Sequence, residues 1–251
     1  MSRPHDATRR RGLQAALLAA LSVPAVLRAE PAPMQRLGVF TLLGNSVRVA
    51  ASELQEVMFK DVGMDDIALD AARAVLQAQR PQAQLSPHRA AEQVNIDDQL
   101  AIGTAAGRRG ELPDWILQAA GAAALSHVLL ITSNSGAMEF RTGMSQVVGN
   151  NRVTGIGFYV GADGRTKHTG TGAVASGYLA PFVQLRLTLI DVAGRSVVNS
   201  VSVSDGYIVG PPEKEAPDPW RFLSRAEKAA ALQRLLKTNI THGVEEVLKA
   251  R

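Results

Sequence analysis

The 251-residue sequence contains no cysteine, and this absence excludes several kinds of protein at once. Without cysteine the chain forms no disulfide, has no lipid attachment site after a signal peptide, and offers no thiolate to a zinc site. Aromatic residues make up only 4% of the chain, whereas 46% of its residues are hydrophobic and 20% are charged. This composition is that of an ordinary globular protein, so its stability must come from a packed aliphatic core.

The sequence also lacks the compact motifs that usually identify an enzyme or a cofactor site. It has no HExxH or HxH pair, no Walker-type GK[ST] and no alternating acids of a calcium loop. The glycine patterns at 155–157 and 170–172 lack the strand, spacing and helix of a dinucleotide fingerprint. We therefore expect no cofactor and no metal, and a protein without catalytic activity is favoured.

Residues 1–29 have the order of a secretory signal peptide: a polar stretch ending in three arginines, an apolar run over 13–27, and small residues. The apolar run is shorter than the roughly 20 residues that cross a membrane, and it contains Pro24. Cleavage after Ala25 or Ala29 fits the pattern, and Ala29 is preferred because a polar stretch follows it. The arginines leave twin-arginine and general export both open. Either route predicts a periplasmic or secreted protein with no membrane span or lipid anchor.

Removal of the signal peptide changes the charge balance of the chain. Lys+Arg falls from 27 to 22 and Asp+Glu from 23 to 22, so the net charge falls from +4 to zero. The remaining sequence has no run of Lys or Arg. A nucleic-acid partner and a polybasic membrane contact are therefore not expected.

Hydrophobic periodicity in the first half of the remaining sequence predicts a hairpin followed by a helix. Two β-prone runs over 37–50 surround Gly44-Asn45, a pair that is typical of a two-residue hairpin turn. An amphipathic helix is predicted over 65–80, with two acids at its start, and Pro81 stops the pattern.

The middle of the chain combines a polar segment with a helix-to-strand unit. Residues 81–112 are polar and rich in proline and glycine, with only weak helical patterning over 97–106. They are predicted to form a surface excursion, which in a compact domain is often functional. A second helix is predicted from residue 113, leading directly into an apolar strand over 127–132.

The second half begins with β structure. A strand is predicted over 152–160, followed by turn residues over 161–172. The alternation over 183–189 and 197–203 predicts a half-buried antiparallel hairpin. Residues 205–219 carry four prolines and mixed charge, so they are predicted to form an exposed loop.

The chain is predicted to end in a helix that packs on the sheet. Ser224 and Glu227 have capping-box spacing, and Gly243 is a place where the helix would break or fray. The apolar face of this helix consists of Leu232, Leu235, Leu236, Ile240, Val244, Val247 and Leu248. Residues 30–251 are therefore expected to form a single α+β domain, with a mixed, mainly antiparallel sheet and two or three helices packed on it.

One set of residues resembles the SGNH hydrolases, whose nucleophilic serine follows the first strand in a Gly-Asp-Ser motif. Here Ser46 follows Gly-Asn after a β-prone run, Asn150 stands for the oxyanion asparagine, and His242 lies near the C-terminus. The resemblance implies acyl transfer with His242 as the base for Ser46 and Asn150 as an oxyanion donor. Asparagine replaces aspartate both before Ser46 and at Asn239, so the carboxylate that orients the histidine is missing.

The order of elements, with LTLIDVAGRSVV over 187–198 joining two strands, is similar to periplasmic domains of the curli-secretion and penicillin-binding-protein-activator lipoprotein type. It is also similar to uncharacterised exported proteobacterial proteins. The first resemblance implies a binding or assembly module rather than an enzyme. This chain departs from that group, because its members are usually lipid-anchored.

The expected function is a non-catalytic periplasmic binding or accessory module of the cell envelope. Its partner would be an envelope protein or a small ligand, contacted through a sheet edge, through 81–112 or through 205–219. The alternative is an SGNH-like serine esterase that uses Ser46 and His242. The oligomeric state is left open.

Overall fold

A computed structural model describes residues 34–50, 54–58, 62–90, 94–141, 147–167, 172, 174–210 and 218–249. The chain divides after Ala32, and the unit Pro33–Arg251 contains every described element. Its helices are α1 (Met64–Gln79), α2 (Ile96–Arg109), α3 (Asp114–Ala122) and α4 (Arg225–Leu248), with a 3-10 turn η2 (Pro219–Phe222). Its strands are β1 (Arg36–Thr41), β2 (Ser46–Ala50), β3 (Leu54–Met58), β4 (Gln84–Arg89), β5 (His127–Ser133), β6 (Ser135–Arg141), β7 (Val147–Lys167), β8 (Val174–Asp191) and β9 (Ser196–Gly206).

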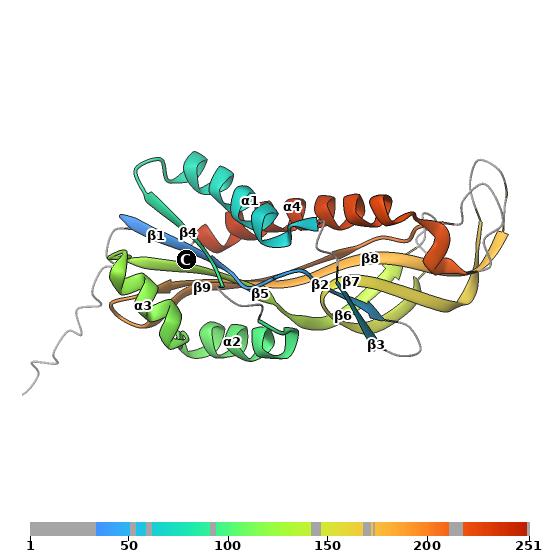
Figure 1. The fold of residues 1–251 in the computed structure, drawn as a ribbon, viewed down its shortest axis with the longest axis horizontal. Helices are drawn as coiled ribbons and strands as arrows, with labels where there is room; N and C mark the ends of the chain where they lie inside the picture. Colours follow the sequence, from blue (N-terminus) through green and yellow to red (C-terminus); the bar gives the residue numbers. More distant parts are fainter. Residues whose placement is uncertain are drawn as a thin grey trace, which may run out of the picture. The chain divides into compact units, whose positions relative to one another are not determined.

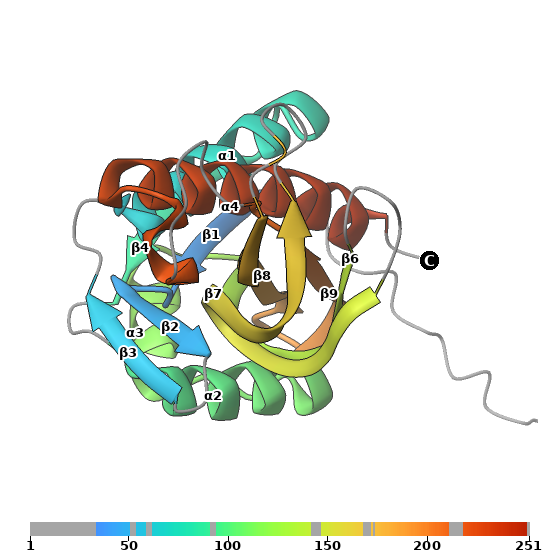
Figure 2. The same ribbon diagram turned by 90° about the vertical axis from the view of Figure 1, so that its right-hand side faces the viewer.

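The strands form a nine-stranded mixed sheet in the order β3-β2-β7-β8-β5-β1-β4, with β6 added beside β7 and β9 beside β8. Three strand pairs are parallel and five are antiparallel. This confirms the predicted α+β class with a mainly antiparallel sheet. Four α-helices are described rather than two or three: α1 and α4 cover one face, and α2 and α3 cover the other (Figures 1 and 2).

Alternation along the central strands separates the core into two layers. On β5, Leu129 and Ile131 face the layer under α1 and α4, whereas Val128 and Leu130 face the layer with α2 and α3. A third cluster fills the curled end of the sheet, where β6, β7 and β8 meet: Met138, Phe140, Val153, Tyr178, Ala180 and Phe182. Because both faces of β5 are covered, its sequence is a continuous apolar run from Val128 to Ile131.

Helix α4 confirms the predicted terminal helix and its cap. The Ser224 hydroxyl accepts from the Glu227 N–H at 3.3 Å, and the Glu227 carboxylate accepts from the Ser224 N–H at 2.8 Å. All seven residues of the predicted apolar face are buried. The prediction of a break at Gly243 is wrong, because α4 continues through it to Leu248.

The predicted hairpin at Gly44-Asn45 is wrong, although both strands exist. β1 pairs in parallel with β4 and β5, while β2 pairs with β3 and β7. A type I′ hairpin needs positive φ at both turn residues, and only Gly44 has one, at 62°. The Asp65 carboxylate accepts hydrogen bonds from the Thr41 hydroxyl (2.7 Å) and the Gly44 N–H (3.1 Å). These bonds hold the turn in a shape that leads from β1 to β2 without pairing the two strands.

The prediction that 81–112 is a surface excursion is also wrong. This stretch contains β4, an edge strand parallel to β1, and α2, which packs on β5, β8 and β9. Pro87 is tolerated in β4 because an edge strand leaves backbone groups outside the ladder. After Ile96 and Gln99, the inner face of α2 continues with small residues: a Cβ at Gly103 would lie 2.3 Å from Thr132 Oγ1, so this part of the helix backbone lies directly on the sheet. Hydrophobic periodicity does not reveal such a face.

The hairpin predicted over 183–189 and 197–203 is confirmed as β8 and β9, with Asp191 opposite Ser196. The sequence predicts one buried face, but β8 is covered on both, so its polar residues Gln184 and Thr188 are only 6% and 1% exposed. The strand predicted over 152–160 is part of the longer β7, which continues to Lys167 through residues predicted as a turn.

The predicted loop 205–219 joins the sheet at its start. β9 continues to Gly206, and the Tyr207 and Val209 N–H groups donate to Pro181 O (3.3 Å) and Leu179 O (2.7 Å) of β8. The exposed-loop prediction is therefore wrong for 205–209. Residues 211–217 lie outside the described residues.

Candidate binding surface

The three residues of the esterase hypothesis lie on three elements. Ser46 is the first residue of β2 and is buried, Asn150 pairs with Glu139 between β7 and β6, and His242 is exposed on α4. Helix α4 packs on α1, β8 and β9, whereas β2 lies between β3 and β7. This packing gives no support to a serine–histidine pair.

Asn239 stands where the SGNH resemblance would require the orienting carboxylate. Its side chain is buried and donates to Leu235 O at 2.9 Å and to Asp205 Oδ2 at 3.4 Å. It thus ties α4 to β9, which is a structural contact.

Within the described ranges, no group of three or more His, Asp or Glu side chains is placed to hold a metal ion. None of the helices that the structure describes has both the length and the apolarity of a membrane span.

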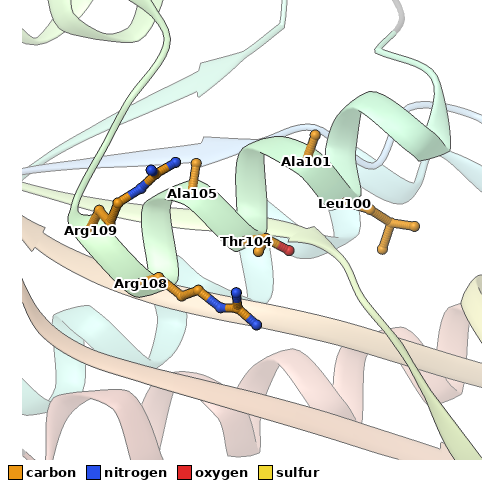
Figure 3. A pocket seen from close by; sticks show the side chains of 6 residues that line it. All are labelled: Leu100, Ala101, Thr104, Ala105, Arg108 and Arg109. Carbon is orange, nitrogen blue, oxygen red and sulfur yellow. The ribbon is translucent and has the colours of Figure 1, made fainter.

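One hollow on the described surface lies on the outer side of α2 and has a volume of about 510 Å³ (Figure 3). It is lined by Leu100, Ala101, Thr104, Ala105, Arg108 and Arg109. All of these lining residues belong to one helix, so a ligand there would be held from one side by small side chains. We do not assign a site to this hollow.

A second hollow of about 400 Å³ lies between two elements and is better built. We call it the Tyr207–Arg234 groove. One wall is the segment that extends β9, and the other is the first half of α4; the lining residues are Tyr207, Ile208, Val209, Leu223, Glu227, Ala230, Ala231 and Arg234. The groove therefore contains part of the predicted 205–219 region, whereas the sequence patterns pointed to no binding role for Ala230, Ala231 and Arg234 of α4.

Two polar groups stand out at one end of this groove. Burial raises the pKa of the Tyr207 hydroxyl, with Arg234 acting against this rise and Asp205 adding to it. The hydroxyl is thus held as a neutral donor. Arg234 is exposed and forms no ion pair with any residue that the structure describes.

The charged side chains at the opposite end of the groove already form contacts within the protein. The Glu227 carboxylate is used in the capping box. The neighbouring Lys228 is 5% exposed, donates to Leu223 O at 2.6 Å, and lies 4.3 Å from the centroid of the Trp220 ring. Burial lowers the pKa of Lys228. These contacts fix the start of α4 and hold the groove in shape.

The outer edge of β9 is the second feature of this region. The backbone N–H groups of Tyr207 and Val209 donate to β8. Because backbone groups alternate in direction along an antiparallel pair, those of the odd-numbered residues of 201–205 point toward β8, and those of the even-numbered residues point away from it. The Ser200 and Gly206 N–H groups donate to the preceding Asn199 and Asp205 side chains at 2.9 and 2.8 Å. Backbone groups of Ser202 and Ser204 are left open, and no described residue pairs with them.

Between the capped Ser200 and the charged Asp205, the β9 edge lacks the features that usually block an edge strand. Residues 196–204 contain no charged residue and no proline. By contrast, the edge strand β4 contains Pro87 and ends in Arg89, and both features discourage pairing with another chain. The sequence shows the serine–valine alternation of β9, but the position of β9 at an edge follows only from the pairing of β8 with β5 and β7 on its other side.

No family model and no curated protein matches the chain. Similar solved structures include a Xanthomonas campestris protein of the DUF330 family, with a TM-score of 0.36, 12% identity, and coverage of 85% of this chain and 84% of that one. A putative neuraminyllactose-binding hemagglutinin homolog from Helicobacter pylori has a TM-score of 0.36, 11% identity, and coverage of 88% and 89%. The LpoB C-terminal domain from Salmonella enterica has a TM-score of 0.24, 12% identity, and coverage of 68% and 82%. Similarity at this level assigns no function to the chain.

Proposed function

We propose that the mature chain is a non-catalytic binding or accessory module of the cell envelope, periplasmic or secreted. Its partner is an extended segment of another envelope protein, which binds as an added strand along the outer edge of β9. The observation that carries the proposal is the open, uncharged edge at Ser202 and Ser204. The signal-peptide pattern of residues 1–29 supports export, and the layout resemblance to penicillin-binding-protein activators supports a binding role.

Addition of a strand to a sheet edge is a common way to hold a peptide, because main-chain hydrogen bonds provide affinity and alternate side chains provide specificity. Each such hydrogen bond contributes about 0.5–1.5 kcal/mol net. At this edge Val201 and Val203 face the layer under α4, and the serines face the opposite side. The partner segment should therefore alternate apolar and polar residues.

The test compares Ser202→Pro with Ser202→Ala by crosslinking the tagged protein in intact cells and identifying the adducts by mass spectrometry. Alanine removes the Ser202 hydroxyl, which accepts from Asn134 at 3.2 Å, but keeps the outward N–H. Proline also removes that N–H and places a ring at the edge. We expect an envelope-protein adduct with the parent and the alanine variant and its loss with the proline variant.

Ser204→Pro repeats the test at a second outward position, with Ser204→Ala as its control. Circular dichroism checks that each variant remains folded. An adduct of equal yield in both proline variants would overturn the proposal. So would an adduct containing only a second copy of this chain.

A further inference from the structure

We infer that the Tyr207–Arg234 groove binds the carboxyl-terminal residue of a peptide, with an apolar side chain on the groove floor and the free carboxylate at Arg234 and Tyr207. This inference deepens the proposed function and rests on it. β9 ends at Gly206, and the next residue, Tyr207, is already a wall of the groove. A strand held along β9 can therefore lead its end into the groove.

The charges along α4 favour one orientation of a peptide bound in the groove. Glu227, Ala230, Ala231 and Arg234 follow one another at helical spacing along one side of α4. Glu227 and Arg234 are separated by seven residues, or about 10 Å of helix at about 1.5 Å per residue. A carboxylate at the Arg234 end is thus close to a cation and about one Debye length from the Glu227 carboxylate at physiological salt. The Asp205 carboxylate, whose charge also acts on Tyr207, accepts a hydrogen bond from the Asn239 amide at 3.4 Å and does not line the groove. The opposite orientation would bring two carboxylates together.

The polar end matches a carboxylate chemically. A guanidinium group presents paired N–H donors that fit the two oxygens of a carboxylate. Arg234 has no ion-pair partner among the described residues, so a carboxylate there need not displace one. The Tyr207 hydroxyl is protonated at neutral pH, as its ordinary pKa of 10.0 already requires, and it can donate a further hydrogen bond.

The remaining lining matches an apolar side chain. Val209, Leu223 and two alanines supply most of the groove between its charged ends. The alanines leave the space open, and the volume of about 400 Å³ lies within the range of about 300–1,000 Å³ typical of ligand pockets. One apolar residue with its terminal carboxylate fits the combination of a floor without charge and a single cation.

The test uses two synthetic probes, acetyl-Ser-Val-Ser-Leu with a free terminal carboxylate and the same peptide with a terminal amide. Binding to the mature protein is measured by titration calorimetry, and the site is mapped by NMR of the ¹⁵N-labelled protein. We expect the acid to bind at least ten-fold more tightly than the amide, with shifts over 207–209 and 230–234. Arg234→Gln should reduce the affinity for the acid to that for the amide, whereas Lys237→Gln, which changes an exposed cation on the same helix outside the groove, should leave it unchanged.

Equal affinities for acid and amide, or an unchanged preference in Arg234→Gln, would overturn the inference. Ala230→Trp gives a second readout, because filling the groove should weaken binding of both probes. Failure of the groove can be told from failure of the edge. If only the groove inference fails, Ser202→Pro still abolishes the adduct in cells; if only the edge proposal fails, the acid preference remains while the adduct is unaffected by Ser202→Pro.

Discussion

Gly243 of α4 lies directly against Leu187 of β8, so that a Cβ atom at position 243 would be only 2.8 Å from Leu187 Cδ1. A methyl group there would force the buried Leu187 side chain to shift. The same atom would lie 3.2 Å from Val203 Cγ1 of β9. Gly243 therefore lets α4 pack close to the β8–β9 hairpin, and the outer strand of this hairpin, β9, carries the proposed binding edge.

Substitution Gly243→Ala should lower the free energy of unfolding by about 1–3 kcal/mol, because overpacking outweighs the gain in helix propensity. The matched control is Gly121→Ala in α3, where a Cβ would meet nothing within 4 Å. That control should stabilise by up to about 1 kcal/mol. Urea unfolding followed by circular dichroism measures both changes, and a stabilising Gly243→Ala would show that α4 is not packed this closely.

Gly103→Ala tests the contact between α2 and the sheet. The added methyl would lie 2.3 Å from Thr132 Oγ1 and would push α2 outward, straining the 3.3 Å hydrogen bond from Arg186 to Gly103 O. We expect a loss of about 1–3 kcal/mol in unfolding free energy. Ala105→Gly, farther along α2 and away from the buried contact, should cost only about 1 kcal/mol through helix propensity. A Gly103→Ala variant that is more stable than the parent, as helix propensity alone would give, would argue against close packing at Gly103.

Asp65 should make stability fall as pH rises. Burial raises its pKa above the ordinary value of 3.8, although hydrogen bonds from Thr41 and Gly44 work in the opposite direction. Between 3.8 and the raised native pKa, the folded protein holds more protons than the unfolded chain. The Asp65 contribution to stability is therefore largest in acid and is lost as pH rises through the native pKa.

Two variants separate the charge of Asp65 from its hydrogen bonds. Asp65→Asn keeps an acceptor oxygen and removes the charge, so it should retain or raise the stability at pH 7 and abolish this part of the pH dependence. Asp65→Ala should lose about 1–3 kcal/mol, because the Gly44 N–H and the Thr41 hydroxyl lose their acceptor. Unfolding free energies from pH 3 to 8 measure both effects. If asparagine proves as destabilising as alanine, the charge itself is needed at this turn.

His127 should have the opposite pH dependence. It is 2% exposed, and burial lowers its pKa below 6.5, with Asp191 acting against the shift. The unfolded chain then binds a proton more readily than the folded one, so the His127 contribution is complete above pH 6.5 and is lost as pH falls through the native pKa. His127→Gln should reduce the fall in unfolding free energy between pH 7 and 5, while His242→Gln on the exposed side of α4 serves as control. An unchanged slope in His127→Gln would remove His127 as its source.

Local sequence patterns identified the elements that local interactions determine. The Ser224–Glu227 box and the alternation of β8 and β9 act over a few residues, and both were correctly predicted. Pairing at Gly44 could not be predicted in the same way, because Asp65, 21 residues later, fixes that turn. The small-residue face of α2 escaped detection because periodicity counts apolar bulk, whereas contact with the sheet depends on its absence.

The candidate surface was predictable only in outline. A sheet edge and the 205–219 region were both suggested, but the sequence did not show which strand lies at an edge. The edge position of β9 depends on the pairing of β8 with β7 and β5 along its other side. The groove combines Tyr207 with Arg234, which are brought together when the residues after β9 align with Leu179 and α4 packs over the sheet. Neither step leaves a local signal in the sequence.

The central claim is that the outer edge of β9 contacts the partner, and a photo-crosslinking amino acid placed at single positions in living cells tests it most directly. One variant carries the crosslinker at Ser204, on the exposed edge of β9, and the other at Gln77, on the exposed side of α1. The account predicts an adduct with an envelope protein from position 204 and none from position 77. An adduct of equal yield from both positions, or one from position 77 alone, would contradict it.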